Sequence, residues 1–173
     1  MPQDSPLPAS PLGRPIAAGT GIGHVHLKVA SLDRMLDFYC GVLGFELTQR
    51  YGTQAAFVSA GGYHHHIGFN TWESAGGNPP PPGTTGLYHL AILYPTRRDL
   101  ADALARLIAA KVPLDGASDH GVSEALYLTD PEGNGVELYR DRPEAEWPRG
   151  ANGELAMVTE RLDLRGLLRE LDG

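Results

Sequence analysis

Residues 23–47, "GHVHLKVASLDRMLDFYCGVLGFEL", decide the predicted fold because the hydrophobic period changes within this one stretch. Residues 25–29 alternate apolar and polar side chains, which is typical of a strand with one buried face. Ser31 is a preferred N-cap residue, and apolar residues then recur at helical spacing as far as Gly44. The stretch therefore predicts a strand that leads directly into an amphipathic helix.

The same pattern returns at an offset of 65 residues. This offset places Thr96, another N-cap residue, on Ser31, and it places His89 on His24. A strand is expected over residues 87–94 and an amphipathic helix after Thr96. The helix N-cap, the alternation of apolar residues in the strand and the histidine all coincide at this one offset. The chain is therefore interpreted as containing an internal repeat.

Further strands complete each half of the repeat. The first half has strand-like segments at residues 45–51, 54–60 and 63–70, and the last of these contains "YHHHIGFN". The second half has strand-like segments at residues 123–129 and 135–140 around the turn "DPEGNG". The chain is therefore predicted to be α+β, with the order strand–helix–strands repeated twice.

The domain organisation follows from proline and glycine as well as from the repeat. Five prolines within residues 1–17 predict a flexible arm, and "GGNPPPPG" predicts a stiff linker. The C-terminal segment has apolar residues at helical spacing. The predicted units are an arm (1–17), one domain (18–143) with modules 18–75 and 84–143 joined by the linker 76–83, and a helical tail (144–173).

Composition excludes several classes of function. The 173-residue chain is 42% apolar and 20% charged, which is typical of a globular protein, and its net charge of −7 disfavours nucleic acid and anionic membranes as partners. The single cysteine, Cys40, permits no internal disulfide. Without an export signal or a long apolar run, the expected location is the cytoplasm.

Two repeat-related histidines and one glutamate suggest a metal site. His24 and His89 open equivalent strands, and Glu137 lies between apolar residues of a late strand. Two imidazoles and one carboxylate form the facial triad associated with non-haem Fe(II), although Mn, Ni or Zn accept the same ligands. Glu137 could instead be a solvated strand residue. His26 is a rival ligand, but only His24 has an equivalent in the second half.

These residues resemble the vicinal oxygen chelate superfamily, which includes glyoxalase I, extradiol ring-cleaving dioxygenases and bleomycin-resistance proteins. The segments that carry the resemblance are the opening stretch, "GLYHLAI" and "LYLTDPEGNGVELYRDRP", within residues 21–143. The resemblance implies two βαβββ modules that form a half-open barrel around a metal. It also implies that His24, His89 and Glu137 are the metal ligands.

Within that superfamily the chain is most similar to type I extradiol dioxygenases, catechol 2,3-dioxygenase among them. A glyoxalase I would carry a fourth ligand, a glutamate, on the last strand of its first module, where this chain has "YHHHIGFN". The dioxygenase resemblance implies that His65 is the acid–base catalyst, with His66 as the alternative if the strand register differs. It further implies active-site roles for Tyr127 and His120.

The implied activity is Fe(II)-dependent opening of a catechol-type diol by O₂, next to the diol. A glyoxalase-type isomerase or lyase and a non-enzymatic bleomycin-resistance-like binding protein remain the alternatives. The expected partners are the small substrate, O₂ and further copies of the chain, as a dimer or a larger homo-oligomer. The well-known extradiol enzymes have four modules, so closure of the substrate pocket here would fall to the tail or to a second subunit. The alternative for the tail is a helix that simply packs on its own domain.

Overall fold

The first half of the repeat forms a four-stranded sheet. The computed structural model describes residues 13–173, so that residues 1–12 of the predicted arm lie outside it. Strand order is β1-β4-β3-β2, with β1 parallel to β4 and the other neighbours antiparallel. The strands are β1 (Val25–Lys28), β2 (Glu46–Tyr51), β3 (Ala55–Ser59) and β4 (Ile67–Asn70).

The second half forms a sheet of the same pattern with one added strand. Its order is β5-β8-β7-β6-β9, and β5 is parallel to β8 as β1 is to β4. The strands are β5 (His89–Leu93), β6 (Gly116–Asp119), β7 (Ser123–Thr129), β8 (Gly135–Asp141) and β9 (Glu160–Arg161). The predicted α+β fold of two βαβββ modules is confirmed, whereas β6 and β9 were not recognised as strands in the sequence.

Each module contributes one main helix. Thr96 caps α2 (Arg97–Ala109) in a capping box with Asp99, as the sequence predicts. Ser31 likewise caps α1 (Leu32–Leu36), but the next turns form the π-helix η1 (Asp37–Val42). Its i to i+5 bonding continues at the C-cap, where the Leu43 N–H donates to the Phe38 carbonyl oxygen at 3.0 Å.

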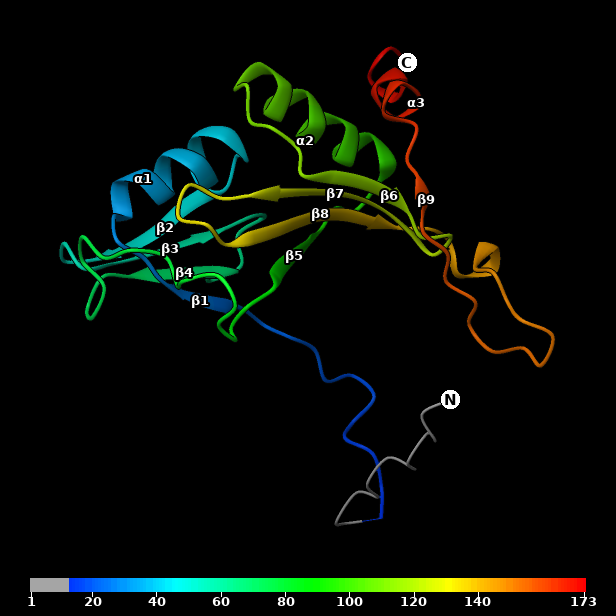
Figure 1. Cartoon of the computed structure of the whole chain (residues 1–173), viewed down its shortest axis with the longest axis horizontal. Helices are drawn as coiled ribbons and strands as arrows, with labels where there is room; N and C mark the ends of the chain where they lie inside the picture. Colours follow the sequence, from blue (N-terminus) through cyan, green and yellow to red (C-terminus); the bar gives the residue numbers. More distant parts are fainter. Residues whose placement is uncertain (1–12) are drawn as a thin grey trace.

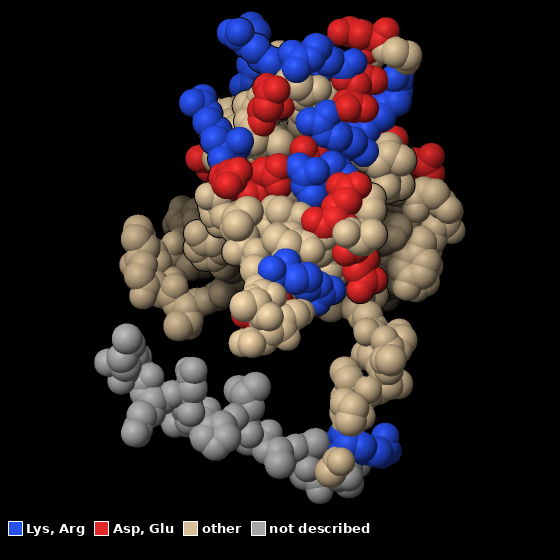
Figure 2. Space-filling model, turned by 90° about the vertical axis from the view of Figure 1, so that its right-hand side faces the viewer, with Lys and Arg blue, Asp and Glu red and all other residues tan. Residues whose placement is uncertain are grey.

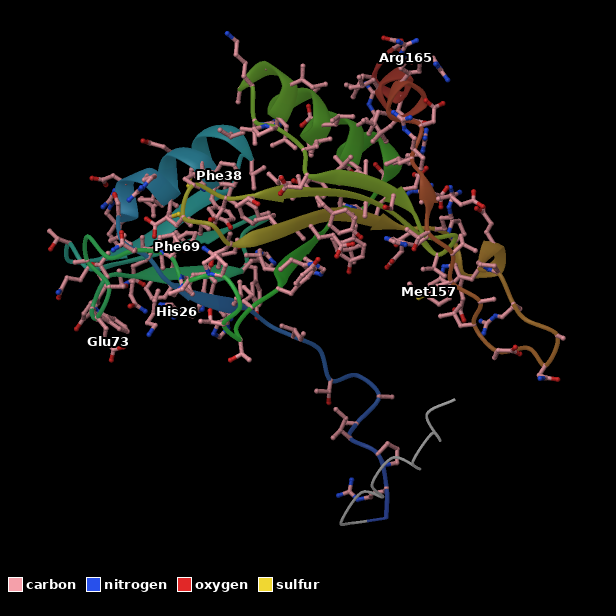
Figure 3. The ribbon with its side chains drawn as sticks, viewed as in Figure 1. His26, Phe38, Phe69, Glu73, Met157 and Arg165 are labelled. Carbon is pink, nitrogen blue, oxygen red and sulfur yellow. The ribbon has the colours of Figure 1, made fainter. Side chains whose placement is uncertain are left out.

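Both main helices cover the same face of the sheets, and the opposite face is open (Figure 1). Buried side chains from both modules form a single core cluster. Phe38 and Phe69 lie between α1 and the first sheet, whereas His26 and Glu73 lie on the open face (Figure 3). Successive side chains of a strand point to opposite faces of the sheet. The strand residues that alternate with the core residues therefore point to this open face.

The turn between β7 and β8 joins the second module to the first. The Glu132 carboxylate accepts hydrogen bonds from the backbone N–H groups of Ala30 and Ser31, the latter at 2.8 Å. Asp130, which is buried, accepts a hydrogen bond from the Tyr39 hydroxyl at 3.1 Å. These contacts hold the β1–α1 connection and η1 against the turn between β7 and β8.

We expect Glu132→Gln to lower the free energy of unfolding by about 1–3 kcal/mol, because two backbone donors lose a charged acceptor. Urea unfolding followed by circular dichroism measures the change. Glu73→Gln is the matched control, since Glu73 is exposed and, within residues 13–173, forms an ion pair only with the exposed Lys28. Equal stability of the two variants would mean that the turn does not hold the modules together.

The C-terminal tail is less helical than its sequence pattern predicts. It contains the 3₁₀ turn η2 (Glu144–Glu146), strand β9, the short helix α3 (Leu164–Leu168) and the 3₁₀ turn η3 (Arg169–Leu171). The Arg97 guanidinium joins the tail to the second module by pairing with Glu170 and with the buried Glu124. Acidic and basic side chains are interspersed over this upper region (Figure 2).

No helix among residues 13–173 combines the length and the apolar composition that a membrane span requires.

Candidate active site

His89 and Glu137 lie side by side on the open face of the second sheet. His89 begins β5, and β8 pairs with β5 so that Glu137 stands opposite Ala91, two residues further on. The Nε2 atom of His89 is 3.0 Å from Oε2 of Glu137, and the glutamate side chain is only 13% exposed. The parallel pairing of β5 with β8 therefore brings a histidine and a carboxylate into contact.

Tyr127 and His120 extend this pair into a hydrogen-bonded chain. The Tyr127 hydroxyl lies 3.1 Å from Oε1 of Glu137 and 2.8 Å from Nε2 of His120. Nδ1 of His120 lies 2.9 Å from the carbonyl oxygen of Val158, to which it can only donate. The tail thus fixes the orientation of the His120 ring, and through it the Tyr127 hydroxyl.

Tyr127 is protonated at neutral pH. Burial raises the pKa of its hydroxyl to about 12, and the adjacent Glu137 carboxylate adds to the effect. Tyr127 can therefore act as a hydrogen-bond donor to an anionic oxygen beside Glu137.

His24 and His65 meet on the first sheet. His24 immediately precedes β1, His65 precedes β4, and their ring centroids are 4.4 Å apart. Phe57 flanks His65, with ring centroids 5.0 Å apart. Partial burial and then the neighbouring histidines, His24 first among them, lower the pKa of His65. A neutral His65 ring can accept a proton near pH 7.

The three consecutive histidines have different surroundings. Nδ1 of His64 lies 2.8 Å from Nδ1 of His65, so one of these rings carries the proton between them and Nε2 of His65 remains available. Nδ1 of His66 accepts a hydrogen bond from the Ala60 N–H at 3.3 Å and also contacts the Ser59 hydroxyl at 3.0 Å. His66 is thus bound to β3, and His64 orients His65.

The predicted start of the strand over residues 63–70 is wrong. Residues 63–66 form an irregular segment, and β4 begins only at Ile67. The preceding glycines, Gly61 and Gly62, both have positive φ angles and form a turn. The His64 carbonyl oxygen accepts a hydrogen bond from the Thr48 hydroxyl at 3.0 Å.

His26, the rival ligand, is engaged elsewhere. Its Nε2 atom lies 3.0 Å from the side-chain nitrogen of Asn70, and its ring stands over Gly68, where a Cβ would come within 3.1 Å of it. Burial, and to a smaller extent His24, lowers its pKa. His26 therefore belongs to a separate cluster on the first sheet.

The residues fit a divalent metal at the His89–Glu137 pair. Donor atoms 3.0 Å apart match two adjacent ligands on one ion whose bonds are about 2.1 Å long. The other ring nitrogen of His89, Nδ1, is buried and has no hydrogen-bond partner among residues 13–173, so Nε2 is the nitrogen that faces the carboxylate and would face a shared ion. Within residues 13–173, no three His, Cys, Asp or Glu side chains are already gathered into an ion-binding cluster.

His24 is thus the predicted ligand that the structure leaves apart from the other two. It lines a cavity of about 750 Å³ that is also lined by His89, at the junction between the two sheets. A second cavity, of about 610 Å³, extends from His89 past Tyr127 and His120 over the second sheet. The open face therefore offers space for a small molecule beside the candidate ligands.

Two features of the site were missed in the sequence. Val158 supplies the carbonyl oxygen that holds His120, and Asp115 lines the 610 Å³ cavity. Both follow from β6 and β9, which were not recognised as strands. The sequence "GASDH" has too few apolar or β-branched residues to signal a strand.

Comparison with known proteins identifies the family of this chain. Residues 21–138 match the model of the glyoxalase/bleomycin resistance protein/dioxygenase superfamily. The chain is 45% identical over 156 residues to a catechol-2,3-dioxygenase of Bacillus subtilis (strain 168), covering 87% of this chain and 52% of that protein. It is 34% identical over 122 residues to biphenyl-2,3-diol 1,2-dioxygenase 2 of Rhodococcus globerulus, covering 68% of this chain and 61% of that protein. The chain thus spans about half to two thirds of the length of these relatives.

Solved structures support the same fold. A glyoxalase/dioxygenase from Nostoc punctiforme superposes with a TM-score of 0.59 at 18% identity, covering 75% of this chain and 98% of that one. A lactoylglutathione lyase from Agrobacterium tumefaciens superposes with a TM-score of 0.55 at 23% identity, covering 72% and 96%. With the family model matched over both modules, the chain belongs to the glyoxalase/bleomycin resistance protein/dioxygenase superfamily.

Proposed function

We propose that this chain is an Fe(II)-dependent extradiol dioxygenase that opens catechol-type diols with O₂. The observation that carries the proposal is the donor set on the open face. It combines a histidine–carboxylate pair at ligand spacing, a neutral tyrosine beside the carboxylate, and a histidine of lowered pKa next to the third candidate ligand. The 45% identity to a protein named catechol-2,3-dioxygenase supports the same reaction class.

The proposed iron ligands are His24, His89 and Glu137. Ferrous iron bound there would supply Lewis-acid activation of the diol and of O₂. The segment at the end of the first module, residues 63–70, contains no Asp or Glu that could act as a fourth ligand of the glyoxalase type. The donor set therefore favours a site with three protein ligands.

The protein's own residues would move and hold protons. The nitrogen proposed to take a proton from a substrate hydroxyl is Nε2 of His65, since its Nδ1 faces His64. The same nitrogen would return the proton as the ring opens. Tyr127, protonated because its pKa is about 12, donates its one hydroxyl proton to Glu137 in this structure and would turn it to a substrate oxygen beside Glu137 when the diol binds. Both atoms of O₂ enter the product as the carbon–carbon bond next to the diol breaks.

An oxygen-uptake assay tests this proposal. Protein loaded with Fe(II) under anaerobic conditions should consume O₂ with catechol or an alkyl- or aryl-substituted catechol and release a yellow ring-opened semialdehyde. Absorbance and an oxygen electrode should report equal rates, because one O₂ is used for each ring. Glutathione-dependent isomerisation of methylglyoxal with Ni or Zn, in the absence of any catechol cleavage by the iron-loaded protein, would contradict the proposal.

A further inference from the structure

The 610 Å³ cavity beside His89 and Glu137 has an acidic far end. Its charged lining residue among the described part of the chain is Asp115, and no Lys or Arg there lines it. The remaining polar groups are neutral hydroxyls, such as those of Ser118 and Thr159, and the two histidines. At this far end a ligand therefore meets a negative side chain, with no Lys or Arg among the described lining residues to balance it.

A continuous row of residues joins the candidate metal pair to Asp115. Gly135 is the strand partner of both His89 and Thr129, and the Thr129 hydroxyl donates a hydrogen bond to Asp115 at 2.7 Å. The row crosses the sheet from β5 through β8 and β7 to β6. Three spacings between neighbouring strands make this distance roughly 14 Å. An aromatic diol with a two-carbon side arm covers much of this distance.

The cavity itself provides the space for a ring along this row. Its volume is about 610 Å³, and His89, Tyr127 and Asp115 all line it. A planar ring can lie in this cavity between the candidate ligands and Asp115, with Tyr127 at its side.

Asp115 has free capacity to bind a substituent. A carboxylate can accept about four hydrogen bonds, and the Thr129 hydroxyl provides one. An ammonium group at the end of the side arm would pair with Asp115, whereas a carboxylate in the same place would be repelled by it.

We propose that Asp115 makes the site selective for catechols with a cationic side arm, the 3,4-dihydroxyphenylalkylamines, over catechols with a carboxylate side arm. The inference rests on the proposed dioxygenase function, because it places the diol at His89 and Glu137. Asp115 would act as a specificity-determining residue that touches the substituent and leaves the ring chemistry to the other groups.

The test compares two substrates of similar length and opposite charge. Steady-state cleavage of 4-(2-aminoethyl)catechol and of 3,4-dihydroxyphenylacetate gives a ratio of kcat/KM values for each protein. We expect at least about a fivefold preference for the amine in the unchanged protein and less than about twofold in Asp115→Asn, in which the amide oxygen still accepts the Thr129 hydrogen bond. Glu73→Gln, which changes the net charge equally at a distant exposed residue, should retain the preference.

Anaerobic calorimetry with the same two compounds provides a readout without turnover. Tighter binding of the amine, lost in Asp115→Asn and kept in Glu73→Gln, supports the proposal even if neither compound is cleaved. Equal binding, or a preference that Asp115→Asn leaves intact, overturns it. Unsubstituted catechol distinguishes failure of the dioxygenase proposal from failure of the Asp115 proposal. If the protein does not cleave it, the dioxygenase function is contradicted. If the protein cleaves it but shows no preference for the amine, only the role of Asp115 is contradicted.

Discussion

Replacing His89 with alanine is expected to remove iron from the protein and to abolish catechol cleavage. His89 and Glu137 already stand at the spacing of adjacent ligands, so deleting the imidazole leaves a carboxylate with one neutral tyrosine partner. Protein loaded anaerobically should hold about one Fe(II) per chain, and His89→Ala should hold less than about a tenth of that. Colorimetric iron determination after gel filtration measures the loss.

The remaining proposed ligands should behave alike. Glu137→Ala and His24→Ala are each expected to lose iron and activity together, although only Glu137 is in contact with His89 in the structure. His26→Ala is the matched control, because His26 is bonded to Asn70 and should not contribute to iron binding. Full iron occupancy in all three ligand variants, or iron loss confined to His26→Ala, would overturn the assignment.

The strand–helix units were predictable because local chemistry specifies them. Ser31 and Thr96 cap their helices in the structure as N-cap residues do in general, and strand parity places Leu27 and Leu90 in the core. The π-helical bonding after Leu36 was not predictable, since π segments are mostly single-turn bulges within α-helices and the apolar spacing of the whole stretch is that of an α-helix.

The part of the candidate site formed by His89, Glu137 and Tyr127 could be anticipated from the sequence. The repeat matched His89 with His24 and placed Glu137 on the last strand of the second module, and the parallel pairing of β5 with β8 brings His89 to Glu137. The antiparallel register of β7 and β8 places Tyr127 directly opposite Glu137. These three residues were identified from the sequence, and the structure brings them together.

Contacts that depend on the tail could not be anticipated. The sequence of residues 154–171 has helical spacing, yet Glu160 and Arg161 pair with β6. An edge strand with unpaired backbone groups gains hydrogen bonds from such pairing, whatever the intrinsic preference of the added segment. The tail reaches the site in this way, through Val158 and His120, which are 38 residues apart.

Changing His65 to glutamine is expected to lower turnover by about 10²- to 10⁴-fold while iron binding is retained, because glutamine preserves polarity but cannot exchange a proton. The ring of His65 touches that of His24, and its lowered pKa keeps it neutral and ready to accept a proton. Single-turnover absorbance after rapid mixing with O₂, together with iron content, separates loss of proton transfer from loss of the metal.

The neighbouring histidines provide the comparison that makes this prediction sharp. His66→Gln should lose less than about tenfold in turnover, because Nδ1 of His66 is occupied by hydrogen bonds from β3 and the ring has a structural role. His64→Gln should lose an intermediate amount, since Nδ1 of His64 faces Nδ1 of His65 and fixes which nitrogen of His65 carries the proton. A larger loss in His66→Gln than in His65→Gln would transfer the acid–base role to His66, because only the ring whose free nitrogen reaches the substrate can carry the proton.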